Sequence, residues 1–178
     1  MINKGTISEN SRIVFVNDGS KDNTWDIIKE LYNNNKYFGG INLSRNRGHQ
    51  NALLAGLMTV KDEADMVISL DADLQDDIEV IDKFVERYYE GSDVVYGVRS
   101  SRKTDTIFKR TTALAFYKLM NKLGVNMVYN HADYRLMSKR ALYGLAEFSE
   151  VNLFLRGMVP LVGYNYSIVE YELSLIHI

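Results

Sequence analysis

The chain has 178 residues, 46% of them hydrophobic, with a formal net charge of −2 and no cysteine. This length supports one domain with a substantial core, and the charge argues against general nucleic-acid binding. The lack of cysteine excludes disulfides and thiolate metal sites, and the sequence has neither the roughly 20-residue apolar run of a membrane span nor a signal-peptide core, so we predict a soluble, cytoplasmic chain.

Strand and helix signals alternate along the first part of the chain. Residues 1–12 are predicted to be a frayed or disordered stretch. A β-branched run at residues 12–16 indicates a strand, and Ser20 or Asp22 can cap the helix that follows it. A second strand is predicted at residues 37–43, and a helix rich in alanine and leucine is predicted at residues 51–60.

The stretch from residue 66 to residue 77 carries the strongest chemical signal. Its apolar, strand-length beginning ends on Asp71 and Asp73, two carboxylates spaced i and i+2. Because α/β proteins bind ligands where buried strands end, both carboxylates can reach one nucleotide or one Mg²⁺ or Mn²⁺ ion. Gln75 can add a neutral oxygen. Taken alone, the same pair also fits solvated loop residues or a helix N-cap.

The pattern continues with a helix and another strand. An apolar stripe over residues 78–88 predicts a helix that Gly91 ends, and residues 93–97 predict a strand. Such alternation predicts an α/β fold with a mostly parallel sheet and helices on both faces. No Gly-x-Gly-x-x-Gly follows a predicted strand, which argues against a dinucleotide-binding fold of the usual kind.

Cationic residues gather in two places. Arg45 and Arg47 precede a predicted helix start, a position that suits an anion, although a solvated basic loop has the same pattern. A larger cluster leads into an amphipathic helix predicted at residues 106–123. Such a cluster also fits a solvated helix start, but cations at a helix entry oppose the helix dipole, which favours a bound anion. The cluster consists of Arg99, Arg102, Lys103, Lys109 and Arg110.

The last third of the chain begins with a polar stretch that contains Asp133. A carboxylate in a partly apolar loop can have a raised pKa, which makes Asp133 a candidate general base. A salt bridge with Arg135 or a turn cap is an equally open interpretation. Ser138 can cap a short helix at residues 139–147. A further helix at residues 152–159 and a final strand at residues 163–172 complete the prediction.

Five stretches together resemble the inverting family 2 glycosyltransferases of the GT-A fold. The resemblance is strongest to the branch that contains dolichyl-phosphate mannose synthases and bacterial polyprenyl-phosphate glycosyltransferases. It covers most of residues 13–172, which we therefore predict to be a partial catalytic domain. The stretches are VNDGSKDNT (16–24), LSRNRGHQ (43–50), LDADLQD with its DxD motif (70–76), GVR (97–99) and DYRLM (133–137).

This resemblance implies transfer of a hexose from UDP- or GDP-hexose to a polyprenyl phosphate such as undecaprenyl or dolichyl phosphate. It implies dependence on Mg²⁺ or Mn²⁺ and assigns the metal to Asp73, Gln75 and Asp71. It assigns the nucleotide-sugar to Asp18, Gly19, Ser20, Arg45 and Asp71. It assigns the acceptor phosphate to Arg99, Arg102 and Arg110, and the catalytic base to Asp133. Since a phosphate acceptor is largely ionised at neutral pH, Asp133 can instead orient it.

Both ends of the chain depart from the family pattern. Residues 1–12 do not match the strand and helix that open the family fold, and residues 173–178 do not match the basic segment, amphipathic helix and membrane spans that follow in this branch. We therefore expect a chain truncated at both ends, whose full-length parent lies at the inner face of the membrane. An unpaired sheet edge would favour a homo-oligomer. Two alternatives stay open: a polysaccharide-type transferase with a sugar acceptor, and an inactive nucleotide-binding fragment.

Overall fold

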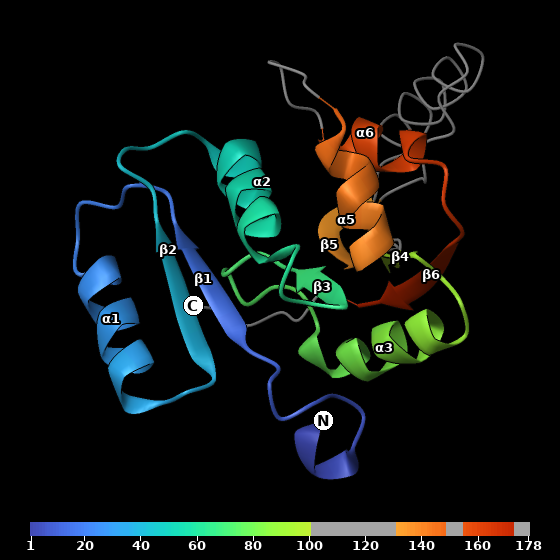
Figure 1. The fold of residues 1–178 in the computed structure, drawn as a ribbon, viewed down its shortest axis with the longest axis horizontal. Helices are drawn as coiled ribbons and strands as arrows, with labels where there is room; N and C mark the ends of the chain where they lie inside the picture. The colour runs from blue at the N-terminus through green and yellow to red at the C-terminus, as the bar shows by residue number, and fades with distance from the viewer. Residues whose placement is uncertain (101–130, 149–154, 173–178) are drawn as a thin grey trace.

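The computed structural model describes residues 1–100, 131–148 and 155–172 (Figure 1). Two of the predicted acceptor-phosphate residues, Arg102 and Arg110, lie outside these ranges. The predicted helix at residues 106–123 lies outside them as well. Within the described residues, no helix is both long and apolar enough to cross a membrane.

The first part of the chain forms a two-stranded parallel sheet from β1 (Ile13–Asn17) and β2 (Phe38–Asn42). The two strands are joined by α1 (Thr24–Asn34). Its N-cap is Asn23 and not Ser20 or Asp22 as predicted, although Asp22, one residue earlier, accepts the N–H of Thr24 through Oδ1 at 3.1 Å. The helix packs closely on β2 because that strand has a glycine at position 40, where a Cβ would lie 2.5 Å from Ile28 Cγ2.

A four-stranded sheet forms the centre of the molecule, in the order β3-β5-β4-β6. The central strand β5 runs antiparallel to both of its neighbours, whereas β4 and β6 are parallel. Three of its four strands therefore run in one direction, as expected of the predicted mostly parallel sheet, and β5 alone runs against them. The strands β3 and β4 keep the parallel sense of a β-α-β unit, but β5 is inserted between them. Their bounds are β3 (Met66–Ser69), β4 (Val94–Arg99), β5 (His131–Ser138) and β6 (Tyr166–Tyr171).

Helices cover both faces of this sheet, which confirms the predicted α/β class (Figure 1). The short 3-10 helix η2 (Ile78–Val80) and α3 (Ile81–Tyr89) pack on one face. On the other face lie α2 (His49–Val60), α5 (Lys139–Ala146) and α6 (Leu155–Leu161).

The side chains of β5 alternate between these two faces, as strand geometry requires. Tyr134 and Leu136 are buried in the core with α3. Met137 is buried in the core with α2, α5 and α6. Asp133 and Arg135 share the alternation of Met137, and the sheet therefore presents these two charged residues toward the side where α2 and α6 begin.

Two local predictions, the helix cap at Ser138 and the disorder of residues 1–12, had different outcomes. The cap of α5 is confirmed, because Ser138 Oγ accepts the N–H of Ala141 at 3.1 Å. The prediction of disorder in residues 1–12 is wrong for the first residues, which form the 3-10 turn η1 (Ile2–Lys4). The reason is apolar contact, since Met1 and Ile7 pack against the core beside α3.

Candidate active site

The loops that follow β1 and β2 are bound to each other. Asn17 Nδ2 donates to Asn42 Oδ1 at 2.8 Å, and Asn17 Oδ1 accepts the N–H of Ser20 at 3.2 Å. Gly19 has a φ of +69°, and a Cβ on this residue would lie 2.5 Å from the backbone nitrogen of Asn46. The predicted nucleotide-binding loop therefore packs directly on the backbone of the loop that carries Arg45.

Asp18 connects this first loop to the start of α2. Its Oδ1 accepts the N–H of Arg47 at 2.7 Å, and its Oδ2 accepts the N–H of Gly48 at 2.9 Å. Gly48 immediately precedes His49, the first residue of α2. Asp18 thus positions the entry to α2, while its nucleobase contact stays a prediction. Ser20 and Arg45 are exposed beside it.

Gly19→Ala is expected to destabilise the protein more than Gly5→Ala does. Both glycines have a positive φ, at +69° and +67°, but nothing lies within 4 Å of a Cβ on Gly5. The control should lose about 1–2 kcal/mol from the left-handed backbone alone. At Gly19 the clash with backbone atoms adds to this cost. Urea unfolding measures both losses, and equal losses would contradict the tight contact between the two loops.

Asp133 is the centre of a buried polar cluster. Its side chain is 2% exposed. From α2, His49 Nε2 lies 3.0 Å from Asp133 Oδ2, and Gln50 Nε2 donates to the same oxygen at 3.4 Å. Arg135, on the same strand, forms an ion pair with it, and Arg156 of α6 donates from its guanidinium at 3.1 Å. Residues from α2, β5 and α6 therefore meet on one carboxylate.

The pKa of Asp133 is lowered, so the prediction that it is raised is wrong. Burial alone opposes ionisation of this carboxyl, but the hydrogen bond from Arg156, the charge of Arg135 and the hydrogen bond from His49 outweigh that effect. The alternative interpretation, a salt bridge with Arg135, is confirmed. Asp133 is consequently ionised at neutral pH and is a weak proton acceptor. Its assignment as catalytic residue stays a prediction.

His49 also links this cluster to the DxD loop. Its Nε2 lies 3.8 Å from Asp71 Oδ1, so the imidazole sits between Asp71 and Asp133. The pKa of Asp71 is raised, first by partial burial and further by the neighbouring charges of Asp133, Asp76 and Asp73, and the interaction with His49 opposes this shift. Asp71, predicted to bind the nucleotide, and Asp133, predicted to be catalytic, are therefore electrostatically coupled.

The remaining predicted metal ligands, Asp73 and Gln75, are exposed on the loop after β3. Asp73 Oδ1 accepts the N–H of Gln75 at 3.0 Å. Among the described residues, no three or more His, Asp or Glu side chains are grouped so that they could hold a metal by themselves. Mg²⁺ is commonly bound by only one or two carboxylates together with substrate phosphates, so an all-oxygen set of this kind fits it. A bound cation would also reduce the repulsion from neighbouring carboxylates, which contributes to the raised pKa of Asp71.

Arg99, the last residue of β4, contacts the C-terminal end of the loop that carries the DxD motif. Its guanidinium contacts Asp76 Oδ1 at 3.2 Å, and its Nε donates to the hydroxyl of Tyr171 at 3.3 Å. The described part of the structure therefore brings Asp71 and Asp133 together around His49 and places Arg99 in a different group of contacts. Sequence reasoning missed the partners His49, Gln50, Asp76, Arg156 and Tyr171.

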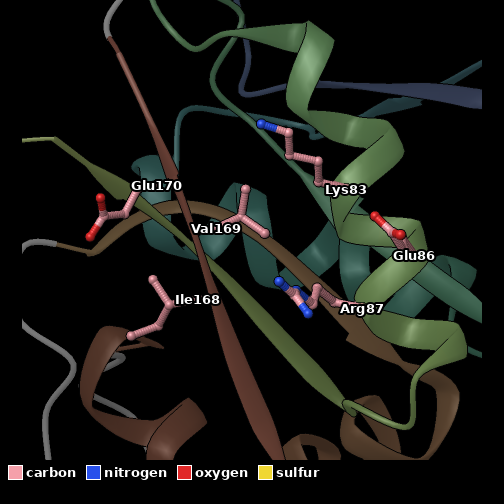
Figure 2. A pocket seen from close by; sticks show the side chains of 6 residues that line it. All are labelled: Lys83, Glu86, Arg87, Ile168, Val169 and Glu170. Carbon is pink, nitrogen blue, oxygen red and sulfur yellow. The ribbon is translucent and has the colours of Figure 1, made fainter.

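A separate hollow of about 350 Å³ lies between α3 and β6. Figure 2 shows the side chains that line it, which have mixed charge and come from α3 and from the middle of β6. None of them is a predicted site residue. The lining residues are Lys83, Glu86, Arg87, Ile168, Val169 and Glu170.

An α/β domain with carboxylates gathered where its strands end has the architecture expected of a GT-A glycosyltransferase domain. Comparison with protein families agrees, since the family described as "Glycosyl transferase family 2" matches residues 2–145. The chain belongs to this family. The match includes residues 2–12, which we had expected to lie outside the family pattern. Family 2 enzymes generally use a divalent metal.

Several curated proteins are similar to nearly the whole chain. The protein named "Uncharacterized glycosyltransferase YkoT" of Bacillus subtilis is 57% identical over 172 residues, which is 97% of this chain and 51% of that protein. The "Bactoprenol glucosyl transferase" of Shigella phage SfX is 42% identical over 160 residues, 89% of this chain and 52% of that protein. A "Prophage bactoprenol glucosyl transferase homolog" of Escherichia coli is 43% identical over the same length, with the same shares of the two chains. The chain thus spans about half the length of the curated relatives it matches.

Proposed function

We propose that the protein transfers a hexose from a UDP- or GDP-linked donor to a polyprenyl phosphate, with inversion at the anomeric carbon. The observation that carries this proposal is the position of His49 between Asp71 and Asp133. The His49 side chain thereby connects the DxD loop, which we assign to the donor, with Asp133, which we assign to catalysis. Relatives named bactoprenol glucosyl transferases support a polyprenyl phosphate as the acceptor.

The donor half of the site lies where β1, β2 and β3 end. We assign the nucleotide-sugar to the two packed loops and the DxD loop, and the Mg²⁺ or Mn²⁺ ion to Asp71, Asp73 and Gln75. When bound, the ion neutralises charge on the departing nucleoside diphosphate. The residues assigned to the nucleotide-sugar are Asp18, Gly19, Ser20, Arg45 and Asp71.

The acceptor is the attacking group in this proposal. An ionised oxygen of the lipid phosphate forms a bond to the anomeric carbon, and the bond from that carbon to the donor diphosphate breaks on the opposite side. Because this oxygen is already ionised at neutral pH, no strong base is required. The low pKa of Asp133 agrees with a role in orienting His49 and Arg156 beside the reacting groups.

The acceptor phosphate is assigned to Arg99, Arg102 and Arg110. A planar guanidinium recognises phosphate through two parallel hydrogen bonds, which makes arginine suited to this task. We further propose that the reaction takes place at the inner face of the membrane, where a lipid phosphate is available, and that segments of the full-length protein outside this chain hold it there.

A transfer assay tests the proposal. The chain, and a full-length form, are incubated with Mn²⁺ and radiolabelled UDP-glucose or GDP-mannose, with undecaprenyl phosphate or an oligosaccharide as acceptor. We expect label in the lipid extract, and we expect EDTA to remove it. Label on the oligosaccharide alone would favour the polysaccharide-type alternative. Calorimetric binding of UDP with Mn²⁺, without any transfer by either form, would favour the nucleotide-binding alternative.

A further inference from the structure

The loop that carries the DxD motif is fixed at its far end by a buried group of three side chains. Asp76 is 5% exposed, and its Oδ1 accepts a hydrogen bond from the Tyr171 hydroxyl at 2.5 Å. The same oxygen accepts from the Arg99 guanidinium at 3.2 Å, and Arg99 Nε donates to the Tyr171 hydroxyl at 3.3 Å. These three residues, which we call the Asp76 cluster, form a closed triangle of contacts.

The Asp76 cluster is supported by three strands. Tyr171 is the last residue of β6, and its carbonyl accepts the N–H of Ser100, just beyond β4, at 2.9 Å. Its ring meets that of Tyr134 on β5 edge to face, with centroids 5.3 Å apart. The Tyr134 hydroxyl in turn donates to the carbonyl of Asp77 at 3.0 Å. The end of the loop is therefore held by β4, β5 and β6 together.

Two properties of the cluster point beyond stability alone. Asp76 Oδ2 is buried without a hydrogen-bond partner among the described residues, and a half-satisfied buried carboxylate is costly. Burial, followed by the hydrogen bond to Asp76, raises the pKa of Tyr171 to about 12. The hydroxyl therefore stays protonated at neutral pH and keeps donating to Asp76. The fold thus keeps a buried carboxyl group with one unpartnered oxygen, and the other oxygen of this group contacts the Arg99 guanidinium.

We propose that Asp76 and Tyr171 are positioning residues that hold the Arg99 guanidinium for the acceptor phosphate and fix it to the loop of Asp71, Asp73 and Gln75. This inference rests on the proposed function. It adds two residues outside the DxD motif, Asp76 and Tyr171, to those that determine recognition of the acceptor. Arg99 then belongs both to the acceptor site and to the Asp76 cluster, which fixes the DxD loop. A substitution that weakens the Asp76 cluster should therefore weaken binding of the acceptor.

Tyr171→Phe removes a single hydroxyl and keeps the ring that packs on Tyr134. With Mn²⁺, UDP-glucose and undecaprenyl phosphate, we expect the KM for the lipid phosphate to rise about 10-fold, the effect of losing one hydrogen bond to a charged group, with kcat within about twofold. The matched control is Tyr166→Phe, which changes an exposed tyrosine on the same strand and should leave both constants unchanged. An acceptor KM that is equal in the two variants would overturn the proposal.

Asp76→Asn provides a second variant of nearly the same shape. It should raise the same KM, and the double variant with Tyr171→Phe should be little worse than the more affected single one, because residues of one cluster are not independent. Fully additive effects of the two changes on the acceptor KM would contradict a shared role.

A measurement without turnover separates this inference from the proposed function. If the wild-type chain transfers no sugar, hydrogen exchange of the backbone amides in residues 71–77 still tests the anchor. Faster exchange in Tyr171→Phe than in Tyr166→Phe supports the positioning of the loop. Unchanged exchange overturns it, whatever reaction the protein catalyses.

Discussion

Asp133→Asn is expected to destabilise the protein by roughly 3–5 kcal/mol, the cost of removing one partner from a buried ion pair. Asp133 and Arg135 are each 2% exposed, and Arg135 bonds to Asp133 through Nη2, while its Nε and Nη1 are buried without a hydrogen-bond partner among the described residues. Without the carboxylate, the Arg135 cation would remain buried and would lose the one ion-pair partner that it has in the described part of the chain. Urea unfolding followed by circular dichroism measures the loss.

Two further variants make this prediction specific. Asp26→Asn breaks the exposed pair of Asp26 and Lys29 on α1 and should cost no more than about 1 kcal/mol. Replacing Arg135 by methionine in the Asp133→Asn background should recover part of the lost stability, because it removes the uncompensated cation. Equal losses for the Asp133 and Asp26 variants would show that the buried cluster contributes little.

The same cluster predicts a pH dependence. Since the pKa of Asp133 is lower in the folded protein than in the unfolded chain, the folded state binds its proton less readily. The resulting stabilisation is present above the unfolded pKa and is lost as the pH falls through the folded pKa. The difference in unfolding free energy between wild type and Asp133→Asn should therefore be largest near neutrality and should shrink in acid.

Asp73→Ala is expected to abolish metal-dependent binding of the nucleotide-sugar while leaving the fold intact. Even outer-shell partners of metal ligands are worth about 10- to 100-fold in metal affinity, so loss of a direct ligand should cost at least the upper end of that range. The side chain is exposed, and among the described residues its hydrogen bond is to the backbone N–H of Gln75. Calorimetry with UDP-glucose and Mn²⁺ measures the change in affinity.

Asn35→Ala is a suitable control for this variant. It removes a contact of the same kind, since Asn35 Oδ1 accepts the N–H of Tyr37 at 3.0 Å, in a turn far along the chain from the DxD loop. Both variants should unfold within about 0.5 kcal/mol of wild type, as exposed substitutions usually do. Undiminished Mn²⁺-dependent binding in Asp73→Ala would show that the metal assignment is wrong.

Local signals in the sequence were sufficient for most of the secondary structure. The runs that became β1 and β3 are apolar over strand length, and the helix cap at Ser138 depends only on residues three positions apart. β5 was missed as a strand because it begins on a polar stretch. Its charged residues are tolerated in the middle of the sheet because Asp133 and Arg135 form an ion pair, and His49 and Arg156 also contact Asp133.

The candidate site was predicted less completely, for a physical reason. A DxD pattern is a local feature, and Asp71 could be singled out from it without knowledge of the fold. The partners of Asp133 are not local, since His49 and Gln50 lie more than 80 positions away in the sequence and Arg156 lies 23 positions away. A lone histidine at a helix start has many common roles, and only the tertiary fold identifies its partner. The Gly-His-Gln sequence at the entry of α2 was the available signal.

The central place of β5 has a consequence for biosynthesis. Its neighbours β3 and β4 both leave the ribosome before it does, and each pairs with β5 instead of with the other. A nascent chain halted before residue 131 would therefore hold two strands with unsatisfied backbone groups, which is the kind of species that chaperones recognise. β3, β5 and β4 can pair only after translation has passed residue 138, and the fourth strand is added only when β6 has been made, at residue 171.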